Sequence, residues 1–141
     1  MRNLKLTVSS LEETDLFAKR FAATLTQGDI VAFFGDLGSG KTTFLKSLIA
    51  TLQNISPDEV HSPTFTYLHI YPGDISVYHF DLYRLNNGTD FVALGFHEFF
   101  TAGGICCIEW SEKIAALLPP STIKVVLSHA GDTSRTIEVI R

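Results

Sequence analysis

One segment, residues 35–42, constrains the fold of this chain more than any other. It reads GDLGSGKT and follows the unbroken apolar run IVAFF at residues 30–34. Such a run is typical of a strand covered on both faces in a parallel sheet. Beyond Thr42, apolar residues recur at helical spacing as far as Leu52. The chain is therefore predicted to run from a buried strand through a glycine-rich loop into an amphipathic helix, as in an α/β fold.

The glycine-rich loop has the residue types and spacing of a P-loop, GxxxxGKT. Glycines allow backbone N–H groups to face an anion, and the helix N-terminus adds its dipole and free N–H groups. Lys41 would place a positive charge on the β- and γ-phosphates of a nucleotide, and the Thr42 hydroxyl would bind the Mg²⁺ that bridges them. The alternative, a glycine-rich turn with a chance lysine, is disfavoured by the flanking strand and helix. The expected nucleotide contacts in the loop are Gly38, Ser39, Gly40, Lys41 and Thr42.

Two carboxylates are candidates to complete this site. Magnesium usually takes a second protein ligand, a carboxylate at the end of another buried strand. Glu109 is the first charged residue after the apolar run 105–108, so it should emerge at the carboxyl edge of the sheet, where α/β folds bind ligands. Asp81, in the segment HFDLYR, would bind metal or orient the attacking water. The alternatives are a solvated glutamate at a strand end and an Asp81–Arg84 ion pair. The predicted catalytic residues are Lys41, Asp81 and Glu109, and the predicted metal ligands are Thr42 and Glu109.

The remaining patterns predict one domain, a P-loop NTPase spanning residues 1–141, because the chain length fits a single core. The expected strands are residues 4–8, 30–34, 65–71, 75–82, 105–108, 123–127 and 136–140. A helix should begin at Leu11, where Ser10 and Glu13 have capping-box spacing, and its apolar face should end before Gly28. Another should begin at Ser111, and short helical turns interrupted at Gly95 should lie in 91–100. The expected sheet is mixed and mostly parallel, flanked by helices, with a hairpin at 65–82 and an antiparallel C-terminal edge.

Composition excludes several functions. The net charge is −4, and Arg84 is the only lysine or arginine between Ser47 and Glu112, so tight direct binding of DNA or RNA is disfavoured.

No apolar run is long enough for a membrane span and the N-terminus lacks a signal-peptide core, which predicts a cytoplasmic protein that does not bind membranes. Cys106 and Cys107 are adjacent in a strand and would point to opposite faces, which indicates structural thiols rather than a redox pair.

Four segments of the chain stand out together: GDLGSGKTT from Gly35, SPTFT from Ser62, HFDLYR from His79 and EW from Glu109. Together they resemble the TsaE (YjeE) family of bacterial ATPases. The loop alone is common to many families, whereas the other three segments in this order and spacing are specific to this one. The resemblance covers nearly the whole chain. One departure is Ser39, where many members carry alanine, and it should be tolerated because that position contributes mainly its backbone.

This resemblance implies an Mg²⁺-dependent ATPase, slow on its own, that is required for threonylcarbamoylation of tRNA beside the anticodon. It implies action on a complex of the TsaB and TsaD proteins, so that tRNA is met only indirectly. The segment 62–66 matches a nucleotide-sensitive region of the family, and Trp110 lies next to its metal site. By resemblance, Thr43 joins the nucleotide contacts, and Ser10 and Arg135 are nominated for the adenine pocket.

Two other functions use the same loop. A small-molecule kinase needs several arginines around the transferring phosphoryl group, whereas every arginine here except Arg84 lies near a chain end. A GTP-driven switch would read guanine with an NKxD segment, and none occurs, so ATP is the expected nucleotide. A binding module that senses nucleotide without needing turnover remains open at this point.

Overall fold

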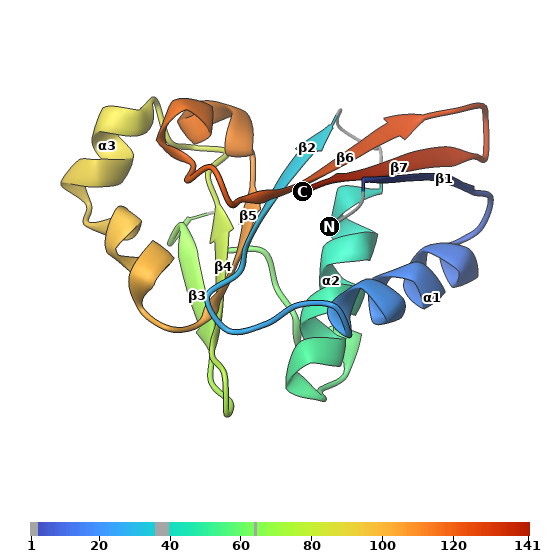
Figure 1. Cartoon of the computed structure of the whole chain (residues 1–141), viewed down its shortest axis with the longest axis horizontal. Helices are drawn as coiled ribbons and strands as arrows, with labels where there is room; N and C mark the ends of the chain where they lie inside the picture. Colours follow the sequence, from blue (N-terminus) through green and yellow to red (C-terminus); the bar gives the residue numbers. More distant parts are fainter. Residues whose placement is uncertain (1–2, 36–39, 64) are drawn as a thin grey trace.

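The computed structural model describes residues 3–35, 40–63 and 65–141. Its strands join one seven-stranded sheet in the order β1-β7-β6-β2-β5-β4-β3 (Figure 1). They are β1 (Leu4–Val8), β2 (Ile30–Gly35), β3 (Leu68–Tyr71), β4 (Val77–Asp81), β5 (Ile105–Glu109), β6 (Ile123–His129) and β7 (Arg135–Ile140).

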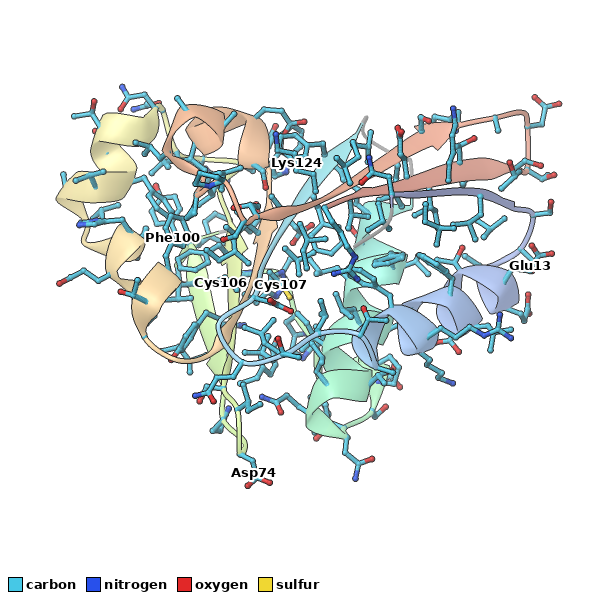
Figure 2. The ribbon with its side chains drawn as sticks, viewed as in Figure 1. Glu13, Asp74, Phe100, Cys106, Cys107 and Lys124 are labelled. Carbon is cyan, nitrogen blue, oxygen red and sulfur yellow. The ribbon has the colours of Figure 1, made fainter. Side chains whose placement is uncertain are left out.

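The centre of the sheet is parallel and its two sides are antiparallel. Strands β6, β2, β5 and β4 run parallel, whereas β7 pairs antiparallel with β6 and β3 pairs antiparallel with β4. The predicted mixed, mostly parallel sheet with an antiparallel C-terminal pair is confirmed. The outermost strand on that side is β1, which pairs with β7 from Leu4–Val139 to Val8–Arg135. The predicted hairpin is also found, with shorter strands and Asp74 at its tip (Figure 2).

Two long helices cover one face of the sheet, α1 (Leu11–Ala22) and α2 (Lys41–Gln53). Short helical segments gather over the opposite face (Figure 1). They are α3 (Gly88–Ala93) and the 3₁₀ segments η2 (Phe96–Thr101) and η3 (Ser111–Leu117), while η1 (Pro57–Glu59) follows α2. None of the helices in the described ranges has both the length and the apolar character needed to cross a membrane.

The start of α1 follows the predicted capping pattern with one shift. The Glu13 N–H donates to the Ser10 Oγ at 3.1 Å, as expected for an N-cap serine. The Glu13 carboxylate accepts from the Ser9 N–H at 3.1 Å, one residue earlier than a capping box requires. The helix ends at Ala22, and Leu25 lies beyond it while still packing against the core. The helix therefore ends three residues before the last residue of the apolar spacing, Leu25.

The segment predicted to form a helix from Ser111 is a 3₁₀ segment with a kink at Ile114, where φ is −127°. The backbone hydrogen bonds here have 3₁₀ spacing: the Lys113 N–H donates to the Trp110 carbonyl at 3.2 Å, and the Leu118 N–H donates to the Ala115 carbonyl at 3.4 Å. The interruption predicted at Gly95 is confirmed, because this residue has a φ of 78° and separates α3 from η2.

Two apolar clusters stabilise the two faces. Phe33 and Phe44 belong to the cluster beneath α1 and α2, whereas Phe80 belongs to the cluster beneath α3, η2 and η3. Cys107 lies in the first cluster and Cys106 in the second, so the prediction that these thiols point to opposite faces of β5 is confirmed (Figure 2). Burial raises the pKa of the Cys106 thiol to about 12 and also raises that of Cys107, which keeps both thiols protonated.

Candidate functional site

The carboxyl ends of the parallel strands bring the two predicted carboxylates together. Asp81 is the last residue of β4, Glu109 is the last residue of β5, and the two are paired in register. Glu109 and Asp81 are each only 5% exposed. Strands that end at one edge of a parallel sheet place such side chains beside each other, at the edge where α/β folds bind ligands.

The lysine of the glycine-rich loop is buried and held in place. Lys41 is 7% exposed, and its Nζ donates to the Gly35 carbonyl at 2.7 Å. The same Nζ lies 4.5 Å from the centre of the Trp110 ring. Trp110 has a φ of 60°, uncommon for a residue with a side chain, and it follows β5 directly. The positive charge of Lys41 is thus fixed between the end of β2 and the residue after Glu109.

Helix α2 begins in the geometry that its glycine permits. Gly40 precedes the helix with a φ of 96° and a ψ of 10°, a left-handed conformation that favours glycine. Thr42 and Thr43 occupy the first turn, where backbone N–H groups have no partner within the helix. Gly38 and Ser39, also predicted to contact nucleotide, lie outside the described residues.

Most of the residues predicted to form the site line one cavity of about 550 Å³. Gly40, Lys41, Thr42, Thr43, Glu109 and Trp110 line it, and so do Ser10 and Arg135, which the sequence nominated by resemblance. The residues that sequence reasoning missed are Val8, Ser9, Leu11, Thr14, Leu127, Thr133 and Ile137. Most of these come from β1, β6, β7 and the start of α1, and only the folded sheet brings them beside the loop.

Asp81 lies beside this cavity rather than on its lining. Its Oδ1 accepts from the Tyr83 N–H at 3.0 Å, and its own N–H donates to the Tyr67 carbonyl at 3.0 Å. The alternative of an Asp81–Arg84 ion pair is not found among the described residues. The Arg84 guanidinium lies 4.4 Å from the centre of the exposed Phe65 ring. Thr64, which belongs to the predicted nucleotide-sensitive segment, lies outside the described residues.

His79 is a site residue that sequence reasoning did not single out. It is 1% exposed, and its Nε2 lies 2.9 Å from Oε2 of Glu109. The signal for it was present in the segment HFDLYR, because residues two apart in a strand share a face. His79 and Asp81 therefore share the face on which Glu109 lies, once β4 is known to neighbour β5.

The oxygen donors on the cavity suit magnesium by type. The Thr42 hydroxyl and the Glu109 carboxylate are hard oxygen ligands of the kind that Mg²⁺ prefers. Across residues 3–35, 40–63 and 65–141, no group of three or more histidine, cysteine, aspartate or glutamate side chains could hold a metal ion by itself. Any magnesium here would need oxygens from a bound ligand and water to complete its coordination.

The sheet and cavity define a class: open α/β proteins that bind a ligand at the carboxyl ends of parallel strands, beside a helix N-terminus. Residues 8–137 match the family described as "Threonylcarbamoyl adenosine biosynthesis protein TsaE". This chain belongs to the TsaE family, whose role is in the biosynthesis of threonylcarbamoyladenosine in tRNA. The resemblance drawn from the four sequence segments is confirmed.

Relatives from several bacteria are similar in sequence to this chain over almost its full length. Proteins named tRNA threonylcarbamoyladenosine biosynthesis protein TsaE are 38% identical in Bacillus subtilis, covering 97% of this chain and 85% of the relative, and 37% identical in Treponema pallidum, covering 92% and 95%. The Rickettsia bellii protein of that name is 41% identical, covering 99% and 96%. The crystal structure of Bacillus subtilis YdiB superposes with a TM-score of 0.80 at 34% identity, covering 98% of this chain and 84% of that one.

Proposed function

We propose that this chain binds ATP together with Mg²⁺ and hydrolyses it slowly, and that this cycle serves tRNA modification by acting on a complex of TsaB and TsaD in the cytoplasm. The observation that supports ATP binding most is that one cavity is lined by Lys41, Thr42 and Glu109 at once. Its volume of about 550 Å³ lies within the range of small-molecule sites, about 300–1,000 Å³.

Each side chain would have its own task. Lys41 would exchange its hydrogen bond to the Gly35 carbonyl for phosphate oxygens, because an ammonium binds charged oxygens more strongly than neutral ones. The Thr42 hydroxyl and the Glu109 carboxylate would hold Mg²⁺, which when bound would offset the negative charge of the phosphates. Asp81 would orient a water or accept its proton from beside the cavity.

The rest of the cavity would take the nucleoside. Its walls there are formed by Val8, Leu11 and Ile137, which are apolar, and by Ser10 and Arg135, which are polar. A base offers flat apolar faces and polar edges, so a mostly apolar wall with few polar groups suits it. Arg135 is the only arginine that lines the cavity within the described ranges. Slow hydrolysis follows, because phosphoryl transfer is fastest where additional arginines neutralise the transition state.

The proposed partners follow from the family role and from charge. A chain with a net charge of −4 has few groups to neutralise tRNA phosphates, so the modification would reach tRNA through partner proteins. Purified TsaB and TsaD should change the ATPase rate or bind this chain in at least one nucleotide state. If neither occurs in any nucleotide state, the partner part of the proposal is wrong.

Calorimetric titration with ATP tests the site itself. Lys41→Ala should abolish detectable ATP binding, and Glu109→Ala should retain much of it while losing hydrolysis, because one residue supplies phosphate charge and the other metal coordination. Lys46→Ala is the matched control, since Lys46 lies on α2 but does not line the cavity. Equal binding and turnover in the wild type and all three variants would contradict the proposal. Phosphate transfer to added metabolites in excess of hydrolysis would favour a kinase instead.

A further inference from the structure

Among the residues that the structure describes, His79 is the only buried histidine, and it lies against the proposed metal ligand. Its side chain is 2% exposed and that of Glu109 is 6% exposed, with 2.9 Å between His79 Nε2 and Glu109 Oε2. Parallel pairing places His79 level with Cys107 and Asp81 level with Glu109. The imidazole therefore reaches along the same face of the sheet to a carboxylate on the neighbouring strand.

The direction of this hydrogen bond follows from its chemistry. A carboxylate oxygen accepts, so Nε2 carries the proton and donates it. Oε2 of Glu109 is thereby held, whereas Oε1 makes no hydrogen bond with any described residue. Because Glu109 also lines the cavity, the contact restricts how its carboxylate turns while leaving one oxygen for another partner.

The other ring nitrogen shows that packing does not explain the histidine. Nδ1 of His79 is buried and has no hydrogen-bond partner within the described ranges. A buried polar atom without a partner costs free energy, and an apolar side chain would fill the same space without that cost. Tyr71 stacks on the ring with 6.4 Å between ring centres, a contact that an apolar ring would also make. What only the histidine supplies here is the Nε2 donor.

We propose that His79 is a positioning residue: by donating from Nε2 to Oε2, it holds the Glu109 carboxylate so that Oε1 coordinates Mg²⁺. This inference rests on the proposed binding of Mg²⁺ and ATP. Carboxylates that bind metals are themselves held by hydrogen bonds, and loss of such a partner typically lowers metal affinity or activity about 10–100-fold. His79 acts on the metal only through Glu109.

The first test compares His79→Leu, which removes the donor, with His79→Gln, which keeps one. His69→Leu is the matched control, since His69 is directly across from His79 on β3 and donates from Nδ1 to the His61 carbonyl, not to Glu109. ATP affinity is measured in EDTA, and Mg²⁺ affinity at saturating non-hydrolysable ATP analogue. We expect equal ATP affinity in EDTA for all proteins. We expect Mg²⁺ affinity to fall about 10–100-fold in His79→Leu, to fall less in His79→Gln and to keep its wild-type value in His69→Leu.

Two outcomes would overturn the inference alone: wild-type Mg²⁺ affinity in His79→Leu, or a loss of ATP affinity that is equal with and without Mg²⁺. If the ATP affinity of the wild type is the same with and without Mg²⁺, the proposed function and this inference are both overturned. A second measurement needs no substitution at all. The Nε2–H proton resonance of His79 should shift when Mg²⁺ is added to the wild type with bound analogue, and an unchanged resonance under conditions where Mg²⁺ binds would also overturn the inference.

Discussion

The two faces of the strand pair β4 and β5 are equally buried and chemically opposite. Toward α3 and η2, the alternate residues are apolar and at most 9% exposed; they are Tyr78, Phe80, Cys106 and Ile108. Toward α2, the same strands begin with Val77 and Ile105, carry His79 and Cys107 at their middle, and end in Asp81 and Glu109. The two carboxylates occupy the carboxyl ends of the strands, where Glu109 lines the cavity.

This difference between the two faces assigns stability to one set of residues on β4 and β5 and function to the other. Burial of an apolar side chain stabilises the fold by about 1.5–3 kcal/mol, whereas a buried polar group must be hydrogen-bonded merely to avoid a penalty. Strand alternation allows both on one strand, because neighbours point to opposite faces. The apolar face should therefore dominate the free energy of unfolding, and the polar face should dominate the chemistry.

The largest expected effect is on the apolar face. Phe80 is fully buried, and the ring centres of Phe91, Phe96 and Phe99 lie within 5.9 Å of its own. Phe80→Ala should lower the free energy of unfolding by about 3–5 kcal/mol, measured by denaturant titration. Phe65→Ala is the control, since Phe65 is 78% exposed and should change stability by less than about 1 kcal/mol. Similar values for the two variants would contradict the comparison.

A smaller effect on stability is expected on the polar face. Asp81→Asn keeps an oxygen that accepts from the Tyr83 N–H, so the free energy of unfolding should fall by about 1.5 kcal/mol or less. ATP turnover should fall about 100-fold or more, because an amide cannot accept a proton from water. Denaturant titration and steady-state turnover measure the two quantities. Destabilisation as large as that of Phe80→Ala, or unchanged turnover, would show that the faces are not divided in this way.

The smallest expected effect concerns Asp15, a charged residue that is only partly buried. It tests whether burial determines how much a charged side chain contributes to the free energy of unfolding. Asp15 on α1 pairs with Lys19 at 2.9 Å and accepts from the Ser47 hydroxyl at 2.8 Å, with 38% of its side chain exposed. Asp15→Asn should cost about 0.5 kcal/mol, since solvent screens such a pair.

The pH dependence of this effect follows from the pKa of Asp15. Hydrogen bonds from Lys19 and then Ser47 hold this pKa below its ordinary value of 3.8. A pKa lowered in the folded state means that the stabilisation is present above pH 3.8 and is lost as pH falls through the lowered pKa. The difference between Asp15→Asn and wild type should thus be constant near neutral pH and vanish in acid. A difference that grows in acid would contradict this assignment.

Much of the central fold could be predicted because its signals are local. The apolar run 30–34 indicated β2, and the helical spacing after Thr42 indicated α2. Strand alternation was enough to place Cys106 and Cys107 on opposite faces. The residue types and spacing in the glycine-rich loop carried the prediction that Lys41 and Thr42 share a site, and both line the cavity.

What sequence reasoning missed depends on contacts between distant segments. His79 and Glu109 are 30 residues apart, and their contact requires β4 to pair with β5 in one register. Apart from Arg135, which the resemblance nominated, the cavity residues on β1, β6 and β7 depend on the strand order, which no local pattern encodes. The end of α1 was misplaced because Leu25 continues the apolar spacing after the helix has stopped. In residues 111–117, the backbone hydrogen bonds from Lys113 to Trp110 and from Leu118 to Ala115 have 3₁₀ spacing, which the apolar pattern did not distinguish from α-helical spacing.

The pairing of β1 with β7 also determines when the site can form during synthesis on the ribosome. Leu4 pairs with Val139, so the first strand has no neighbour until the last one has left the ribosomal tunnel (Figure 1). The cavity takes residues from Val8 to Ile137, and a nascent chain that ends before β7 lacks part of its wall. A growing polypeptide that ends before β7 thus lacks the complete cavity, and a ligand that needs the whole wall can stabilise the chain only after β7 has formed.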